Sequence, residues 1–330
     1  MPSRPDAIEK AVLAVLTGTP LADAAARVGV AAPTLGSAAE TYRTAGRAAI
    51  DNPADTWVHF FVQPASWDTA ENAFATQLFP YLRDAETSGD ILSWWYVRKH
   101  PVWRLRFQPG PATTATRLRT SLTGTLTALQ QQGVITTWSH GIYEPETAAL
   151  GGPRGMDAAH RLFHTDSRAI LREALSRHHA TGPVIPVRRP ELSILLCSAM
   201  LRAAGQEWTE QGDVWDRVAQ MRQLPTCTTP ESITSTTSSI GRLMAADTVA
   251  MTAPGQALEL LEERTAAFTQ TGHDLAEAAR TGELTRGLRA MLALMVIFHW
   301  NRAAIPTHVQ AVLARAARDH ILGPPLGTPC

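Results

Sequence analysis

The sequence predicts an α+β fold, in which a split βαβ (ferredoxin-like) antiparallel sheet is combined with a large helical C-terminal part and a small helical N-terminal segment. Between residues 57 and 138, aromatic and β-branched segments with period-two alternation are interleaved with amphipathic segments, in the order strand, helix, strand, strand, helix, strand. That order is typical of the split βαβ pattern. From Gly151 onward the apolar residues recur almost entirely with helical spacing.

The elements of the sheet region follow from short sequence patterns. Strands are expected at residues 57–63, 91–98, 102–108 and 134–138. Helices are expected at residues 66–83 and 113–131. In the first of these helices Phe74, Leu78 and Leu82 fall on one face and Ser66 can cap the start.

The two ends of the chain are expected to be helical. Residues 5–49 read as three short helices, and Asp51-Asn52-Pro53 marks a boundary. We therefore expect a small helical segment at 1–52 and an α+β domain at 53–330. In the C-terminal part, helices are expected at 153–177, 190–204, 214–221, 255–281, 283–300 and 306–322. The Thr/Ser-rich stretch 226–239 is expected to be a loop or disordered.

The composition excludes several classes of function. The 330 residues carry 30 basic and 30 acidic side chains, and this balance argues against nucleic acid as the main partner because duplex binding depends on phosphate neutralisation. No apolar run is long enough to span a bilayer, and the N-terminus lacks a basic-then-apolar export signal. Three scattered cysteines fit a reducing compartment, so we expect a cytoplasmic protein.

The segment 91–108 concentrates cations among aromatic residues. Strand alternation places Trp103, Leu105 and Phe107 on one face, and Arg104 and Arg106 on the other. Two arginines side by side on a sheet either remain solvated or bind an anion, and bidentate arginine–carboxylate pairs are strong and oriented. Both interpretations stay open at this point.

Three further groups of residues could carry chemistry. His160 and His164 lie four apart on a helix, but neither a third ligand nor a His-Glu-x-x-His pattern accompanies them, so no metal is expected. Glu144 and Glu146 could act as a general base on a turn-rich connector, and Asp166-Ser167 is expected to end one helical stretch and start another.

His299 lies on the apolar stripe of its helix. Leu288, Leu292, Met295 and Arg302 fall on the same stripe. A histidine in this position is either a core residue with satisfied hydrogen bonds or, with arginines nearby, the acid or base of a proton transfer.

Several separated segments together resemble a known family. They are Trp94–Arg106, Tyr143–Gly152, Leu192–Val218 and Val296–Arg302, and they agree with the family in order and spacing over residues 57–322. The chain resembles the thiopeptide-type bacteriocin biosynthesis domain, a relative of the C-terminal elimination domain of class I lantibiotic dehydratases. The resemblance implies an enzyme that acts on a ribosomally made precursor peptide and needs neither a metal nor an organic cofactor.

The resemblance also implies roles for particular residues. His299, in the Phe-His-x-Asn-Arg segment, and Arg98, in the Tyr-Val-Arg segment, match catalytic residues of the family. Arg104 and Arg106 match its Arg-x-Arg strand and, with Arg302, are expected to bind the substrate.

The sequence departs from the family in the middle motif. Full-length dehydratases commonly show Tyr-x-Arg-Glu and then Arg-Tyr-Gly-Gly, whereas this chain has Tyr143-Glu144-Pro145-Glu146 and Ala149-Leu150-Gly151-Gly152. Either Arg154 replaces the missing carboxylate contact, or elimination is not the reaction.

Three functions therefore remain open. The first is elimination of glutamate from glutamylated Ser or Thr, which leaves dehydroalanine or dehydrobutyrine and needs a partner protein that glutamylates the peptide with glutamyl-tRNA. The second is a thiopeptide [4+2] cyclisation that forms a pyridine. The third is non-catalytic binding of the precursor peptide, with residues 1–50 docking a leader segment. A homodimer is compatible with all three.

Overall fold

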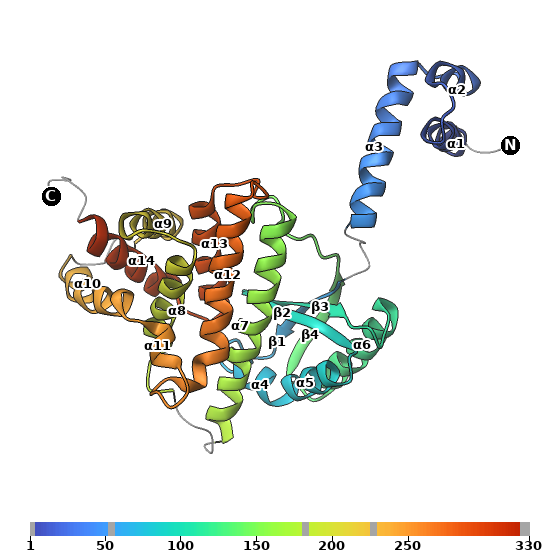
Figure 1. Cartoon of the computed structure of the whole chain (residues 1–330). Helices are drawn as coiled ribbons and strands as arrows, with labels where there is room; N and C mark the ends of the chain where they lie inside the picture. The colour runs from blue at the N-terminus through green and yellow to red at the C-terminus, as the bar shows by residue number, and fades with distance from the viewer. Residues whose placement is uncertain (1–3, 52–56, 180–184, 225–229, 324–330) are drawn as a thin grey trace. The chain divides into compact units, whose positions relative to one another are not determined.

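The computed structural model describes residues 4–51, 57–179, 185–224 and 230–323. By its contacts the chain divides into two units, Met1–Thr56 and Trp57–Cys330, each of which is described by itself (Figure 1). No helix in the described part of the chain is long and apolar enough to cross a membrane.

The N-terminal unit consists of three helices, as predicted: α1 (Arg4–Leu16), α2 (Leu21–Val28) and α3 (Ala32–Asp51). Its buried core is small and mostly alanine, with Val12 and Leu35 as the larger members. Gly29 ends α2 in the left-handed region (φ 66°), from which its N–H donates to carbonyls of the last turn.

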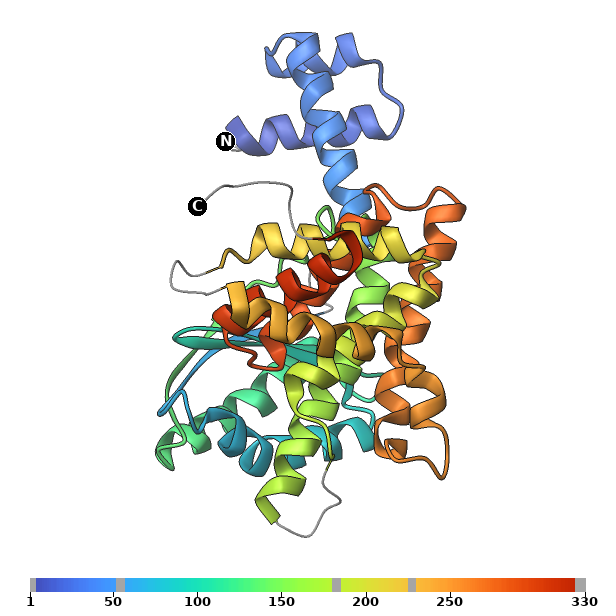
Figure 2. The same cartoon turned by 90° about the vertical axis from the view of Figure 1, so that its left-hand side faces the viewer.

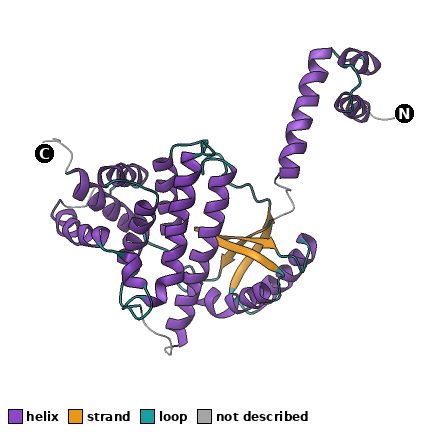
Figure 3. Ribbon diagram, viewed as in Figure 1, coloured by secondary structure: helices purple, strands orange, loops and turns teal. Residues whose placement is uncertain are grey.

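The second unit is built on one four-stranded antiparallel sheet, which confirms the four predicted strands (Figure 3). The strands are β1 (Val58–Pro64), β2 (Ile91–Lys99), β3 (Val102–Pro109) and β4 (Ile135–Gly141), in the spatial order β2-β3-β1-β4. Leu105 pairs with Phe60 on one side and Tyr96 on the other. Residues directly opposite each other share a face, so this register sorts the side chains of three strands into two sets.

The set of side chains that includes Trp103 packs against α4 (Ala70–Gln77), α5 (Phe79–Thr87) and α6 (Ala115–Gln131). The ring of Phe74 on α4 meets Trp103 edge-on, with centroids 4.6 Å apart. The prediction of a single helix at 66–83 is wrong, because Pro80 lies in the first turn of α5 and cannot continue a preceding helix. The first helix also begins after Thr69, so Ser66 is not its cap.

The remaining helices cover the other side of the sheet and extend away from it (Figures 1 and 2). They are α7 (Pro153–His179), α8 (Arg189–Ala203), α9 (Trp208–Met221), α10 (Pro230–Ala245), α11 (Thr248–Thr252), the short 3₁₀ helix η1 (Glu259–Leu261), α12 (Glu262–Arg280), α13 (Leu288–Arg302) and α14 (Thr307–Leu322). In Figure 1, α12 lies between α7 and α8, and it contacts both.

Three expectations about these helices are corrected. The helix α7 runs through Asp166-Ser167 without a break, because both side chains are buried and bonded: the Ser167 hydroxyl accepts the backbone N–H of Tyr96 at 3.3 Å. The Thr/Ser-rich stretch is helical from Pro230 onward, since buried Ile240 and Met244 anchor α10; residues 226–229 of that stretch lie outside the described part.

The third correction concerns helix ends. The helix expected at 214–221 begins earlier, at Trp208, because Glu207 and Glu210 form a capping box there. The helices expected at 255–281 and 283–300 begin at Glu262 and Leu288.

The packing between α6 and the sheet generates a stability prediction. Leu122 is fully buried in this layer, so Leu122→Ala is expected to lower the free energy of unfolding by about 2–5 kcal/mol through lost burial and a residual cavity. Leu92, which is 58% exposed on β2, is the matched control. Leu92→Ala is expected to change the free energy of unfolding by less than about 0.5 kcal/mol. Denaturant unfolding measures both; equal losses would contradict this packing.

Candidate active site

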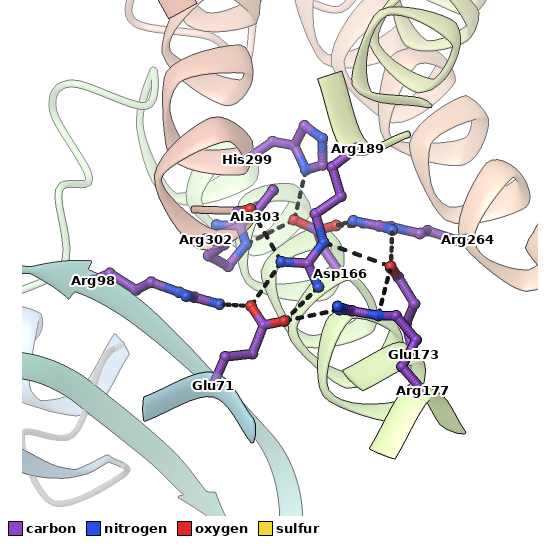
Figure 4. Close-up of polar contacts among 10 residues, drawn as sticks. All are labelled: Glu71, Arg98, Asp166, Glu173, Arg177, Arg189, Arg264, His299, Arg302 and Ala303. Atoms are coloured by element: carbon purple, nitrogen blue, oxygen red, sulfur yellow. Dashed lines mark hydrogen bonds and ion pairs between the residues drawn. The ribbon is translucent and has the colours of Figure 1, made fainter. Parts of the chain in front are cut away.

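A buried carboxylate at the centre of α7 gathers residues from two other helices (Figure 4). The Asp166 Oδ2 atom lies 2.9 Å from His299 Nδ1 and accepts from Arg302 Nε at 2.9 Å, both on α13. Its Oδ1 atom accepts from Arg264 on α12, through Nε at 3.0 Å and Nη2 at 2.7 Å. The structure therefore brings together two predicted site residues, His299 and Arg302, on an acid that joins three helices.

The charges in this cluster determine its protonation state. Burial opposes ionisation of Asp166, but its interactions with His299, Arg264 and Arg302 outweigh burial and hold the pKa of Asp166 well below its ordinary value. Burial lowers the pKa of His299, although Asp166 acts in the opposite direction. His299 is therefore neutral at pH 7, and Asp166 is an anion.

This protonation state selects one tautomer of His299. Because a carboxylate only accepts hydrogen bonds, the proton lies on Nδ1 and the lone pair on Nε2. Among the described residues no group hydrogen bonds to His299 Nε2, nor to Nη1 and Nη2 of Arg302, and all three atoms are buried. The Arg302 guanidinium instead lies over the ring of Phe163, 4.2 Å from its centroid. The cluster therefore keeps a free hydrogen-bond acceptor on His299 and two free donors on Arg302.

Arg98, the other predicted catalytic residue, lies in a second cluster centred on Glu71 of α4 (Figure 4). The Glu71 carboxylate binds Arg98, forms a bidentate pair with Arg189 at 2.6 and 2.7 Å, and contacts Arg177 at 3.0 Å. Burial opposes the charge on Glu71, but the bonds from Arg189 and the charge of Arg98 lower its pKa to about 2. Arg98 is therefore held by an acid of the chain itself.

Glu173 links the two clusters. Its Oε1 atom lies 3.6 Å from Nε of both Arg177 and Arg189, and its Oε2 atom lies 4.0 Å from Arg264 Nη1. A continuous series of hydrogen bonds and ion pairs thus runs from His299 to Arg98 (Figure 4).

The Arg-x-Arg strand lies in a third cluster, on the sheet face opposite α4 and α5. Arg106 is 3% exposed, with its guanidinium 4.1 Å from the centroid of Trp95 and 5.0 Å from that of Tyr143. Arg104 is half-buried and lies over Phe61. Arg106 is therefore not on a solvated face.

Two histidines accompany Arg106. His59 Nδ1 donates to the Ile142 carbonyl at 3.1 Å, and the hydroxyl of Tyr143 lies 2.7 Å from His160 Nε2. Burial and the charge of Arg106 lower the pKa of each histidine to about 4. Burial also lowers the pKa of Arg106 to about 10, so it remains a cation at pH 7.

The other predicted residues lie elsewhere. Arg154 is at the start of α7, where it pairs with Glu283 at 3.3 Å on the surface rather than joining the arginines above. His164 contacts Glu86 and the backbone of Trp94, away from the bonds made by His160. No group of three potential metal ligands exists among the described residues.

Several residues of these clusters were not predicted as site residues from the sequence, among them Asp166, Arg264, Glu71 and Arg189. The sequence does carry a signal for Asp166 and Arg264, because each charge interrupts an apolar stripe of its helix. Asp166 lies between Leu162 and Ile170 at four-residue spacing, and Arg264 lies four residues before buried Phe268. Glu71 and Arg189 offer no such pattern, because their partners are distant in sequence.

The low pKa of Glu71 makes stability depend on pH. Its pKa is about 2 in the folded chain against an ordinary 4.5, so its stabilisation is fully present above pH 4.5 and is lost as the pH falls toward 2. Glu71→Gln is expected to lower the free energy of unfolding by about 3 kcal/mol at neutral pH, and by progressively less below pH 4.5. Exposed Glu277 is the control, for which Glu277→Gln should have little effect at any pH. Urea unfolding from pH 7 to 2 measures the free energy of unfolding of both variants. A loss of stability in Glu71→Gln that does not vary with pH would show that the ionisation of Glu71 does not control stability.

Comparison with known proteins identifies a family whose match begins where the second unit begins. The family described as lantibiotic biosynthesis dehydratase, C-terminal part, matches residues 57–321. No curated protein sequence matches the chain.

Two solved structures share the fold. The tRNA-dependent lantibiotic dehydratase MibB from Microbispora sp. 107891 superimposes with a TM-score of 0.57 at 17% identity, over 82% of this chain and 28% of MibB. The pyridine synthase TbtD from thiomuracin biosynthesis superimposes with a TM-score of 0.52 at 12% identity, over 81% of this chain and 98% of TbtD. The chain thus spans about a quarter of MibB and nearly all of TbtD.

The family match covers most of the chain and includes the elements that carry all three clusters. The chain therefore belongs to the family of lantibiotic dehydratase C-terminal domains.

Proposed function

We propose that this chain eliminates glutamate from glutamylated Ser or Thr residues of a ribosomally made precursor peptide, leaving dehydroalanine or dehydrobutyrine. The observation that carries the proposal is the neutral His299, whose Nε2 lone pair is free because Asp166 holds Nδ1. A second protein is required in this proposal, one that glutamylates the peptide with glutamyl-tRNA.

The chemistry requires a base and cationic donors. The base removes the Cα proton, the electron pair of that bond forms the Cα=Cβ double bond, and the Cβ–O bond breaks to release glutamate as a carboxylate. His299 Nε2 takes the proton in this proposal, and Asp166 stabilises the imidazolium that results. The free Nη1 and Nη2 donors of Arg302 stabilise the charge that develops on the substrate carbonyl oxygen.

The arginines divide by whether an acid of the chain binds them. Arg98 and Arg154 are bound to Glu71 and Glu283 of this chain. In this proposal Arg104 and Arg106, each with unpaired guanidinium atoms among the described residues, recognise the free carboxylate of the glutamyl group.

The burial of His299 sets a condition on the proposal. Its side chain is 1% exposed, and the ring of Phe268 lies edge-on to it with centroids 5.0 Å apart. The peptide must therefore displace the side chains that cover Nε2. Once the peptide is bound in their place, water is excluded and the reaction takes place in a dry environment.

A second function, a [4+2] cyclisation that forms a pyridine, is favoured by one observation. The middle motif of this chain, Tyr143-Glu144-Pro145-Glu146, lacks the arginine that full-length dehydratases commonly carry there. Mass spectrometry separates the two functions when the purified chain is incubated with a glutamylated peptide and, separately, with a peptide that carries two dehydroalanines. Loss of glutamate from the first peptide supports elimination, and ring formation with loss of the leader from the second supports cyclisation.

The role of His299 is tested by His299→Asn, which keeps a side-chain N–H near Asp166 and removes the basic nitrogen. Elimination is expected to slow by about a hundredfold or more, with glutamylated peptide accumulating, because a positioned base contributes at least that much. Exposed His308 is the control, and His308→Asn should eliminate at the wild-type rate. Single-turnover mass spectrometry measures the rates, with thermal melts confirming the fold; if His299→Asn kept the wild-type rate, His299 would not be the base.

A further inference from the structure

The two outer strands of the sheet, β2 and β4, differ in how their free edges are covered. At the β2 edge, side chains of α7 bond to the backbone: the Ser167 hydroxyl accepts the N–H of Tyr96 at 3.3 Å, and His164 Nδ1 lies 3.0 Å from the carbonyl oxygen of Trp94. At the opposite edge, β4 pairs with β1, and no strand among the described residues pairs with the other side of β4. We call that side of residues 135–141 the open edge.

The backbone of the open edge keeps unused hydrogen-bonding groups. In an antiparallel pair, every second residue of a strand turns its N–H and C=O away from its neighbour. At the start of β4 the Thr136 carbonyl accepts from Gln130 Nε2 at 3.0 Å. Within the part of the chain that the structure describes, no side chain bonds to the backbone of residues 137–141. Another extended chain would supply the missing partners.

The strand also lacks the features that normally protect a free edge. Natural edge strands are usually very short, charged or interrupted by proline. The seven residues of β4, Ile-Thr-Thr-Trp-Ser-His-Gly, include no charged residue of the Asp, Glu, Lys or Arg type and no proline. Thr136, Thr137, Ser139 and His140 are exposed, and Ile142, the next residue after the strand, is 86% exposed. This composition favours pairing with another strand.

The size of the open edge argues against a second copy of the chain as its occupant. A strand of seven residues is about 23 Å long and, with its side chains, about 10 Å across. Pairing of two copies along this edge alone would therefore bury roughly 250 Å² per partner, against about 800 Å² in a stable interface. A peptide that adds as a strand is held by main-chain hydrogen bonds and needs no such area.

The open edge is continuous with the sheet face that the proposed function uses. Ser139 of β4 is the register partner of Phe61 on β1, which is itself the partner of Arg104 on β3. Residues directly opposite each other share a face, so every second side chain of an added strand would project from the face that carries Arg104.

We propose that the open edge of β4 binds an extended, uncharged, Ser/Thr-rich segment of the precursor peptide as a fifth strand. Thr137 and Ser139 favour such a segment, because hydroxyl side chains opposite each other in an antiparallel pair form hydrogen bonds. The main-chain bonds do not depend on side-chain identity, so successive Ser and Thr residues of one peptide can occupy the same strand. This inference rests on the proposed function and names the surface that holds its substrate.

The test measures amide hydrogen exchange by NMR on the purified full chain, with and without an acetylated and amidated octapeptide of alternating Thr and Ser. The outward-facing amides of residues 135–141 are expected to exchange at least about tenfold more slowly with the peptide, because each gains a partner in the added strand. The amide of Tyr96 is the internal control, because Ser167 already bonds to it, and it should exchange equally in both samples.

A second peptide separates strand addition from side-chain contacts. The same octapeptide, methylated on every backbone nitrogen, keeps its side chains but has no backbone donor, and it should leave the exchange of β4 unchanged. Unchanged exchange with the first peptide, or equal protection by the methylated one, would overturn the proposal. Protection of β4 that rises with protein concentration in the absence of peptide would also overturn it, because a second copy would then fill the edge.

Variants assign the effect to the open edge. The double variant Thr137→Lys/Ser139→Lys adds the charges that natural edge strands use against pairing. It is expected to raise the octapeptide concentration that gives half-maximal protection by at least about tenfold. The control Thr116→Lys/Thr120→Lys adds the same charges at exposed positions of α6 and should behave as wild type. Thermal melts establish that both variants are folded.

The two proposals fail in different ways. If wild-type protein removes glutamate from glutamylated peptide but the octapeptide leaves β4 unchanged, the open edge is not the docking surface and the elimination stands. If the octapeptide protects β4 while glutamylated peptide is left unchanged, the elimination fails and a peptide-binding edge remains.

Discussion

A single carboxylate in the interior, that of Asp166, determines what the surrounding residues can do. It is fully buried, and three charged or polar side chains from two other helices bond to it. Such a group is costly to desolvate, and it is retained only with partners of good geometry. Here the partners fix the positions of α12 and α13 against α7, and they leave His299 neutral with one nitrogen free. The same contacts thus hold the helices together and prepare a base.

The clusters differ in whether their hydrogen-bonding capacity is used. Around Glu71 the carboxylate is saturated by three arginines, which is what a structural ion-pair network requires. Around His299 and Arg106, buried atoms lack partners among the described residues. The cluster around Glu71 also holds two unpaired buried atoms, Arg98 Nε and Glu173 Oε2, but its central carboxylate is filled by arginines. We therefore place the proposed chemistry at His299 and Arg106 and assign Glu71 to the framework.

Local patterns predicted much of the fold. The alternation in WVHFFVQ and VWRLRFQ identified β1 and β3, and apolar spacing identified most of the helices. The failures have physical causes: Pro80 divided an expected helix, and a Thr/Ser-rich stretch formed a helix because buried Ile240 and Met244 outweighed its weak propensity. His299 and Arg302 could be singled out together because they share a helix. Their meeting with Asp166, 133 residues away from His299, depends on tertiary packing that no local pattern encodes.

The protonation state of His299 is the most direct test of this account, and ¹⁵N NMR of protein labelled at histidine measures it. At pH 7 the account predicts a His299 ring with Nδ1 protonated and Nε2 carrying a lone pair, and Asp166→Asn should disturb this state. A ring protonated on both nitrogens, or on Nε2 alone, would contradict it, because neither form leaves a basic nitrogen facing away from Asp166.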